Sequence, residues 1–385
     1  MLPALSILPS TAVLEMTWAC NHACLFCSCP WFDGATQPRP GEMPIAEWKE
    51  LVGTFARAGV TSFCFTGGEP LLKEGLPELI AFTARLTAHH IETVDGVLRK
   101  QDLPPHLYLL SNGKAVTDET LEMCRELNIA LSISLPGVET FGEHTRGGQP
   151  VENVLRIFRK ASAMGIATTA GITVTRRNFH ELYETIAMAL IAGANQILLN
   201  RFMPGGRGLA NRGLELSVEQ IRQIPEIAEA VLKKADRRGH IGTEYPRCLV
   251  DPGKYTHIKV GTRCSAASDF FVVGPSGQLR VCNHSPVDLV HWRDYAELKD
   301  HPYWLQFALK DWHLNDCGGC SHLGVTCDGG CREAAHVSCG DVLGMDPVFR
   351  GQRPSPVRTL EQELVPQGNA PLEYPISNRE YPTSK

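Results

Sequence analysis

Residues 12–200 alternate short runs of β-branched residues with amphipathic segments, and this alternation leaves few folds open to the chain. Repeated βα units favour a parallel sheet, because each helix carries the chain back to begin the next strand in the same direction. We expect six strands, at residues 13–17, 60–65, 107–110, 129–135, 166–174 and 196–200. Apolar residues between the first two strands recur at helical spacing, at Ile45, Trp48, Leu51, Val52 and Phe55. The pattern predicts an α/β fold, a partial (β/α)6 barrel of the TIM-like kind.

Length and charge restrict the partners of such a chain. At 385 residues and 43% hydrophobic content, it can bury one barrel-sized domain and one smaller domain. Its 37 basic and 42 acidic residues form no basic stripe, so nucleic acid is not an expected partner. The N-terminal segment lacks the pattern of a signal peptide, and no stretch approaches the roughly 20 apolar residues of a membrane span. We therefore expect a cytoplasmic protein without a membrane partner.

The cysteines divide the chain further. Most of the fourteen fall near residue 20 or after residue 247, which favours metal ligation over a disulfide scaffold in a chain of this size. Residues 217–239 read as a polar amphipathic helix, and the segment beyond Pro347 is rich in proline and polar residues. The expected parts are a barrel at 1–215, a helical linker at 216–247, a cysteine-rich domain at 248–345 and an irregular tail at 346–385.

Three cysteines follow the first expected strand directly. Cys20, Cys24 and Cys27 have the spacing CxxxCxxC, at the edge of a parallel barrel where active-site loops collect. A 4Fe-4S cluster normally takes four thiolates, so three cysteines on one loop leave one iron open to an external ligand. A structural zinc site completed by Cys29 or His22 is the alternative. We expect Cys29 to pack beside the site instead.

A second motif, Thr66-Gly67-Gly68-Glu69-Pro70, follows the second expected strand. Two glycines let the backbone approach a ligand closely, and Pro70 presets φ where the next helix begins. Together with CxxxCxxC one strand earlier, this loop closely resembles the radical S-adenosylmethionine (SAM) superfamily. The resemblance implies that SAM binds the open iron through its amino and carboxylate groups, with Gly67, Gly68 and Glu69 near the ammonium group.

The resemblance implies further SAM contacts along the barrel. Arg146 matches an arginine that pairs with the SAM carboxylate, as a guanidinium fork fits two oxygens, although it could equally be a solvated loop residue. Phe26 is expected near the adenine or in the core. Residues 200–206 resemble a strand end that lies over the adenine in peptide-modifying relatives. The remaining expected SAM contacts are Asn112, Ser132 and Ser134.

The C-terminal cysteines have a different spacing. Cys264 is followed by twelve residues, Gly277, four residues and Cys282, and the residues between read as a hairpin with strands at 270–273 and 278–281. The order then continues with Cys317, Cys320, Cys327, Cys331 and Cys339. This order resembles the SPASM domain, which carries auxiliary clusters in radical SAM peptide and protein maturases. The gap of six residues between Cys320 and Cys327 is one longer than is typical.

The resemblance assigns these cysteines to two auxiliary 4Fe-4S clusters. The first would be held by Cys264, Cys282, Cys331 and, across a gap that is longer than usual, Cys248. The second would be held by Cys317, Cys320, Cys327 and Cys339. One or two four-cysteine zinc sites are the competing interpretation. Cys64 and Cys124, on a strand and a helix, are expected to be buried apolar residues.

The resemblance implies reductive cleavage of SAM to methionine and a 5'-deoxyadenosyl radical, followed by hydrogen abstraction. SPASM enzymes mostly act on peptides, so we expect a ribosomally made precursor peptide to be crosslinked, epimerised or shortened by backbone excision. The alternatives are a radical SAM dehydrogenase or cofactor-biosynthesis enzyme acting on a small molecule or protein side chain, and a non-enzymatic zinc- or cluster-binding module. No catalytic acid or base can be assigned.

Two partners besides the peptide are expected. One is an electron donor such as flavodoxin or ferredoxin, which would reduce the triad cluster. The other is a separate leader-recognition protein, because the first strand begins near Val13 and leaves no room before it for a leader-binding domain.

Overall fold

The six expected strands are all present in the computed structural model, which describes residues 7–32, 41–94, 97–310 and 312–349. Their boundaries shift by only one or two residues from the expected positions. They are β1 (Thr11–Glu15), β2 (Ser62–Thr66), β5 (His106–Ser111), β6 (Ala130–Ser134), β7 (Thr168–Val174) and β8 (Gln196–Arg201). All six are parallel to their neighbours, in the order β8-β7-β6-β5-β2-β1, so the predicted α/β fold is confirmed.

The sheet continues beyond these six strands at both edges. The parallel strands β9 (Gly239–Ile241) and β10 (Ile258–Val260) extend it past β8. At the other edge β11 (Phe270–Val273) pairs in parallel with β1, and β12 (Leu279–Arg280) is antiparallel to β11, which confirms the predicted hairpin. The expected linker and cysteine-rich domain therefore both contribute strands to the barrel sheet.

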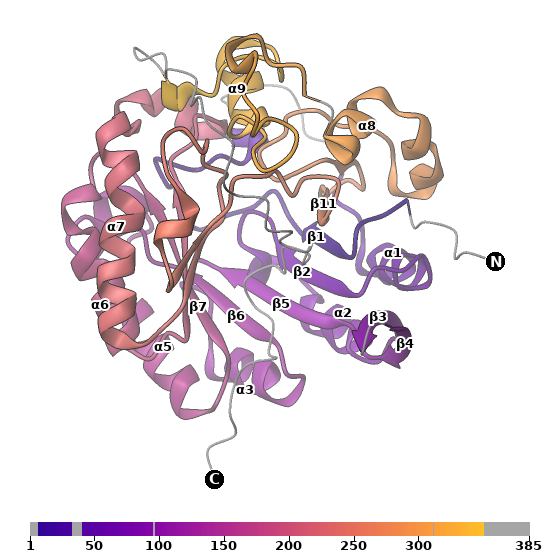
Figure 1. Ribbon diagram of the computed structural model, residues 1–385. Helices are drawn as coiled ribbons and strands as arrows, with labels where there is room; N and C mark the ends of the chain where they lie inside the picture. The colour runs from indigo at the N-terminus through magenta and orange to yellow at the C-terminus, as the bar shows by residue number, and fades with distance from the viewer. Residues whose placement is uncertain (1–6, 33–40, 95–96, 311, 350–385) are drawn as a thin grey trace.

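Helices surround the outside of the curved sheet (Figure 1). The apolar residues of α5 recur at i, i+3 and i+4, so that one face of this helix packs against the sheet. Capping boxes begin α3, at Thr117 and Thr120, and α7, at Ser217 and Gln220. The helices are α1 (Ile45–Arg57), α2 (Leu76–Thr83), α3 (Asp118–Glu126), α4 (Phe141–Thr145), α5 (Val151–Ala163), α6 (Leu182–Ile191) and α7 (Val218–Ala235).

The barrel and the cysteine-rich region share one hydrophobic core. Phe55 on α1 lies edge to face with Phe271 on β11, with ring centroids 5.4 Å apart, and both side chains are fully buried. Phe55 also meets Trp292, which follows the hairpin. Burying a phenylalanine contributes about 1.5–3 kcal/mol, so this packing ties the two regions together. Cys64 and Cys124 are buried, as expected.

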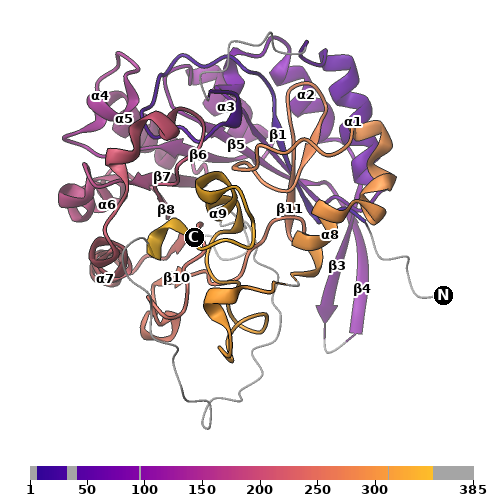
Figure 2. The same ribbon diagram turned by 90° about the horizontal axis from the view of Figure 1, so that it is seen from above.

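The C-terminal segments lie over one end of the sheet (Figures 1 and 2). They include α8 (Pro302–Leu309) and α9 (Arg332–Cys339). Phe307 of α8 shares a cavity with Leu110 and Asn200, which lie near the carboxyl ends of β5 and β8. The cysteine-rich region thus covers the end of the barrel at which the loops after the strands meet.

One supersecondary element was not predicted. Strands β3 (Ala88–Val94) and β4 (Val97–Leu103) form a separate antiparallel sheet that projects from the body of the molecule in Figure 2. Most of the expected tail, residues 350–385, lies outside the described residues.

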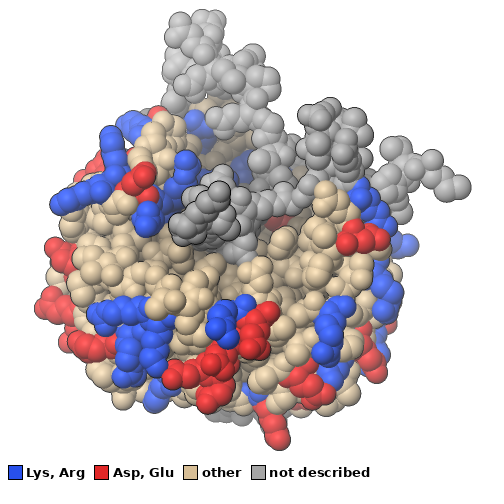
Figure 3. All heavy atoms as spheres, turned by 90° about the horizontal axis from the view of Figure 1, so that it is seen from below, with Lys and Arg blue, Asp and Glu red and all other residues tan. Residues whose placement is uncertain are grey.

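On the face shown in Figure 3, basic and acidic side chains are interspersed, in keeping with the nearly balanced composition. Among the described helices, none is long and apolar enough to cross a bilayer.

Candidate functional site

The loop that carries Cys20, Cys24 and Cys27, here called the triad loop, is clamped by the Gly67-Gly68 loop. The backbone N–H of Gly68 donates to the carbonyl of Thr17 (3.0 Å), and that of Glu69 donates to the carbonyl of Ala19 (2.8 Å). Gly67 has φ of +130°, and a Cβ on Gly68 would collide with the Ala19 carbonyl. Both glycines are therefore required for contact with the triad loop, a role that the sequence analysis did not foresee.

The three triad thiols lie close enough to influence one another. Burial raises the pKa of the Cys24 thiol, and negative charge on Cys27 and Cys20 raises it further. Burial also raises the pKa of Cys20. Three neighbouring thiolates in a partly buried loop are costly unless a metal offsets their charge. This donor set fits a metal cluster, in which each cysteine binds a different iron.

Glu69 and Asn112 connect the triad loop to the carboxyl end of β5. The Glu69 carboxylate is fully buried and accepts from the Ser111 hydroxyl (2.9 Å), the Asn112 N–H (2.8 Å) and the Leu71 N–H (3.3 Å). The Asn112 amide donates to Asn21 Oδ1 (2.7 Å) and to Cys20 Sγ (3.8 Å). A carboxylate has about four acceptor sites, so most of the capacity of Glu69 is used within the protein.

The segment before Arg146 lies against the middle of the triad loop. Ala23 N–H donates to the Thr145 carbonyl (3.1 Å), and Leu25 N–H donates to the His144 carbonyl (2.9 Å). Arg146 itself is exposed and ends α4 in a left-handed conformation with φ of +47°. The structure therefore places the backbone just before Arg146 against the triad loop and leaves the Arg146 side chain exposed to solvent.

The remaining expected SAM contacts lie at different depths. Phe26 is partly buried, 6.1 Å from the His144 ring, and packs against an apolar cluster that includes Phe202. Ser132 is buried within β6, whereas Ser134 is exposed at its carboxyl end. SAM contacts at these three residues stay a prediction.

Arg207 is a neighbour of the triad that the sequence analysis missed. It lies in the 3-10 segment Gly206–Leu214, where its guanidinium donates to the Cys24 carbonyl (3.1 Å) and lies 4.6 Å from the centre of the Phe32 ring. Its positive charge lowers the pKa of Cys24 and Cys27, against the effect of burial. The available signal was its position, one residue beyond the 200–206 segment singled out from sequence.

Cys29 and His22, the two candidates for a fourth ligand, differ in their surroundings. The Cys29 thiol donates to the Gly67 carbonyl (3.9 Å), and hydrogen bonding from Cys29 lowers the pKa of Cys27 to about 7, so Cys29 lies against the triad. His22 is buried, with Nε2 3.2 Å from the Gln149 amide nitrogen, and burial lowers its pKa to about 4. In the described part of the chain, no three His, Cys, Asp or Glu side chains are grouped so as to hold a single metal ion.

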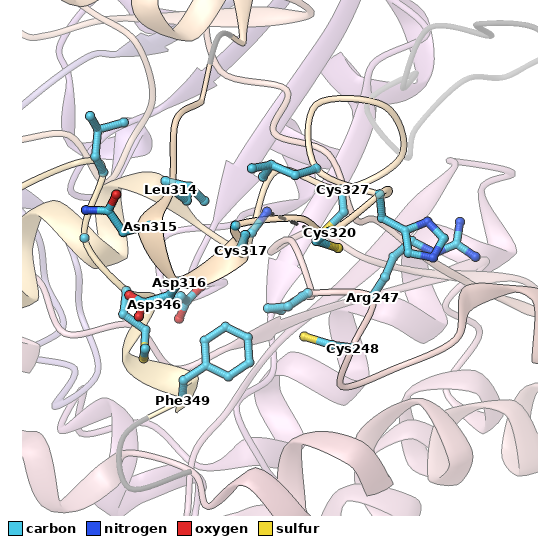
Figure 4. A pocket seen from close by; sticks show the side chains of 18 of the residues that line it. Arg247, Cys248, Leu314, Asn315, Asp316, Cys317, Cys320, Cys327, Asp346 and Phe349 are labelled. Atoms are coloured by element: carbon cyan, nitrogen blue, oxygen red, sulfur yellow. Dashed lines mark hydrogen bonds between the residues drawn. The ribbon is translucent and has the colours of Figure 1, made fainter. Parts of the chain in front are cut away.

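The C-terminal cysteines line two separate cavities. One, of about 280 Å³, is lined by Cys264, Cys282 and Cys331 together with barrel residues that include Leu110 and Asn200. The other, of about 120 Å³, is lined by Cys248, Cys317, Cys320 and Cys327 (Figure 4). Cys248 thus lies with the second set rather than the first, and Cys339 lines neither cavity.

The segment after β8 connects the triad to the larger of these cavities. A Cβ on Gly206 would collide with the carbonyl of Cys29, so this glycine lies against the triad loop. Three residues earlier, Met203 packs against Cys331 and Ala334. The larger cavity therefore lies across one short segment from the triad.

Comparison with known proteins identifies the family of this barrel. Residues 14–189, which contain the triad and the Gly67-Gly68 loop, match the family model of the Radical SAM superfamily. Residues 14–189 form a radical SAM domain. The enzyme is similar to the PqqA peptide cyclase of Xanthomonas campestris pv. campestris (strain 8004), with 26% identity over 349 residues that cover 88% of this chain and 86% of the relative.

Two further comparisons concern a second sequence relative and a solved structure. The enzyme is 24% identical to the AdoMet-dependent heme synthase of Nitratidesulfovibrio vulgaris, over 89% of this chain and 93% of that protein. It shares its fold with Streptococcus suis SuiB bound to precursor peptide SuiA, with a TM-score of 0.65, 13% identity, and coverage of 88% of this chain and 75% of that one. The family implies SAM and an iron–sulfur cluster, and the three triad thiols, which lie close enough to raise one another's pKa, fit such a cluster.

Proposed function

We propose that this enzyme modifies a ribosomally made precursor peptide, with one 4Fe-4S cluster on the triad and two auxiliary clusters in a SPASM-like domain at residues 248–345. When bound, SAM and the triad cluster supply a 5'-deoxyadenosyl radical that abstracts hydrogen from the substrate. The residues of the chain hold and orient these groups and exclude water. The result would be a crosslink, an epimerised residue or an excised backbone unit.

The observation that carries this proposal is the larger cavity, between the carboxyl ends of the barrel strands and the first auxiliary set. Leu110 and Asn200 line its barrel side, and Cys264, Cys282 and Cys331 line the other. A substrate group placed there would lie between the triad loop and the first auxiliary cluster. Its mixed apolar and polar walls are typical of a binding site.

The size of this cavity favours a peptide. Its volume of about 280 Å³ is at the lower end for small-molecule sites, and a cluster on the three cysteines would take part of it. That space suits one side chain of an extended peptide better than a large, flat macrocycle. The similarity to a peptide cyclase supports the same choice. A small-molecule substrate is the second candidate, favoured by the similarity to a heme synthase.

The proposal includes partners and a compartment. Reductive cleavage of SAM consumes one electron, which a flavodoxin or ferredoxin would deliver, and a separate protein would recognise the leader of the precursor. All fourteen cysteines are free in the structure, which suits the reducing cytoplasm.

Anaerobic reconstitution tests the clusters and the chemistry together. We expect about twelve irons per chain, which is four for each of three clusters, and 5'-deoxyadenosine that forms only with SAM and a reductant. Replacing Cys20, Cys24 and Cys27 with Ala should leave about eight irons per chain and abolish 5'-deoxyadenosine, because only the open-iron cluster chelates SAM. Zinc in place of iron, or cleavage that persists in this triple variant, would refute the proposal.

The peptide is tested separately by mass spectrometry. If a short precursor peptide is encoded beside this gene, it should change mass when incubated with the enzyme, SAM and reductant, and adding a small protein encoded there should increase turnover. An unmodified precursor in the presence of active SAM cleavage would favour the small-molecule alternative. Full turnover and tight leader binding by this chain alone would remove the need for a leader-recognition partner.

A further inference from the structure

Four cysteines converge on the smaller cavity from two directions. Cys317, Cys320 and Cys327 come from one short segment, and Cys248 comes from the loop between β9 and β10. Figure 4 shows the Cys248 side chain directed into this cavity, across from Cys317 and Cys320. Four thiols around one space are the number that a fully ligated 4Fe-4S cluster requires.

The two segments are also connected through their backbones. The N–H of Arg247, next to Cys248, donates a hydrogen bond to the Cys327 thiol, and so does the N–H of Gly329 (3.3 Å). Thr262 accepts from the Asp328 N–H (3.0 Å) and donates its hydroxyl to the Thr326 carbonyl (2.7 Å). The Arg247 bond holds the segment around Cys327 against the loop that carries Cys248, and the Thr262 bonds hold it against the chain just before Cys264.

Cys339, the position that the SPASM resemblance assigns to this cluster, has different surroundings. Like Cys248 it is exposed, but it is the last residue of α9, its thiol donates to the Ala335 carbonyl of the same helix (2.9 Å), and it does not line the cavity. Gly344 lines the cavity, and a Cβ there would collide with the Cys339 sulfur, so Gly344 lies against Cys339 at the cavity wall.

We infer that Cys248, not Cys339, completes the second auxiliary set with Cys317, Cys320 and Cys327. This inference rests on the proposed function, which supplies the auxiliary clusters. A consequence follows for the first set, which keeps only Cys264, Cys282 and Cys331 as thiolate ligands. One iron of that cluster would then lack a cysteine ligand in the cavity shared with the barrel.

The test isolates the second set. A background variant with Cys20, Cys24, Cys27, Cys264 and Cys282 replaced by Ala keeps only this site and should hold about four irons per chain after anaerobic reconstitution. Adding Cys248→Ala should leave one iron of this cluster without a cysteine ligand, and the electron paramagnetic resonance signal of the reduced cluster should change. Adding the matched control Cys339→Ala should leave the iron content and the signal unchanged.

A second measurement tests the inference even if the background variant misfolds. In the otherwise unaltered enzyme, Cys339→Ala should hold about twelve irons and keep the parent's electron paramagnetic resonance signal, whereas Cys248→Ala should change that signal, and circular dichroism of both variants should match the parent. A changed signal or lost iron with Cys339→Ala, or an unchanged signal with Cys248→Ala, would overturn the inference. If the site held one zinc ion in place of four irons, the auxiliary clusters of the proposed function would be refuted. If that zinc were then lost with Cys248→Ala and kept with Cys339→Ala, Cys248 would still be supported as the fourth ligand.

Discussion

Arg201, in the last position of β8, forms a buried ion pair with Asp346, with 2.5 Å between Nη2 and Oδ2. The Asp346 carboxylate also accepts hydrogen bonds from the N–H groups of Cys331 (2.7 Å) and Val348 (3.0 Å). One carboxylate thus joins a barrel strand to a cysteine of the first auxiliary set. The barrel and the cysteine-rich region are held together by charge as well as by the shared core.

Asp346→Asn should therefore destabilise the whole protein. Neutralising one partner leaves the Arg201 guanidinium buried without its counter-charge, which costs about 3–5 kcal/mol. Urea unfolding of the anaerobic protein measures the change, and Asp236→Asn, at a fully exposed side chain, is the control that should change stability by less than about 0.5 kcal/mol. Equal stability of the two variants would show that Arg201 finds another partner.

Gly68→Ala should remove the triad cluster while sparing the auxiliary ones. Its Cβ would collide with the Ala19 carbonyl and displace the triad loop. We expect a loss of about four irons per chain, the content of one cluster, together with the loss of SAM cleavage. Gly213→Ala is the matched control, because nothing lies within 4 Å of a Cβ at that position. Full iron content in the Gly68 variant would mean that the loop accommodates the methyl group.

Arg146→Ala should weaken SAM binding by about 1.5–3 kcal/mol, the range for a hydrogen bond to a charged group. The Arg146 side chain is exposed, and the backbone of the two residues before it bonds to the triad loop. Equilibrium dialysis against SAM measures the dissociation constant. The control Arg156→Ala removes an arginine that bonds to Asn153 on α5 and should leave it unchanged. Equal affinities for SAM in both variants would identify Arg146 as a solvated loop residue.

Arg207→Gln should lower the reduction potential of the triad cluster. A positive charge beside the thiolates favours the more negative, reduced state, so its removal makes reduction harder. A redox titration followed by electron paramagnetic resonance compares this variant with Arg212→Gln, which removes an arginine paired with Glu215 on the same 3-10 segment. If the reduction potential were unchanged in both variants, the role of Arg207 would be structural, through its hydrogen bond to the Cys24 carbonyl.

Glu229 makes stability depend on pH. Although burial opposes the effect, hydrogen bonds from the Thr256 hydroxyl and from the N–H groups of His257 and Ile258 lower its pKa to about 2. A carboxyl whose pKa falls on folding stabilises the protein above the unfolded pKa, near 4.3, and loses this effect as the pH drops towards 2.

Glu229→Gln should accordingly cost about 1.5 kcal/mol at pH 7, and the gap from the parent should shrink at pH 4. Melting temperatures of the variant and the parent at the two pH values measure this difference in stability. Glu226→Gln, an exposed residue on the same helix, should show no such gap. A gap of the same size at both pH values would contradict the role assigned to the Glu229 charge.

The sequence predicted the parts whose signals are local. The six barrel strands carry their own β-branched patterns, and the repeating apolar residues of α1 and α7 mark those helices. The triad and the Gly67-Gly68 loop were identifiable because each motif is contiguous. Strands β9 and β10 were not predicted because each has only three residues, too few to show a periodic pattern. They form because they pair with the edge of the existing sheet.

The parts that could not be predicted depend on contacts between distant residues. Nothing local distinguishes Arg207 from other loop arginines until the fold brings it to Cys24. Likewise, Cys248 lies 16 residues before Cys264 and 69 residues before Cys317, so its place in the sequence favoured the first set, and only the cavity shows that it faces the second. Glu69 was expected to face a ligand, whereas its carboxylate is bonded mainly to Ser111 and to backbone N–H groups.

The pairing of β1 with β11 has a consequence for how the protein is made. Thr11 aligns with Phe270, so the outer edge of β1 stays without its partner while the intervening chain is translated, a delay on the order of ten to fifty seconds at typical ribosome speeds. Such an edge is prone to pairing with other chains. The triad cysteines Cys20, Cys24 and Cys27 follow β1 directly. They therefore leave the ribosome well before β11, the strand that pairs with β1. Iron delivery to the triad should therefore be safest after Val273 has left the ribosome.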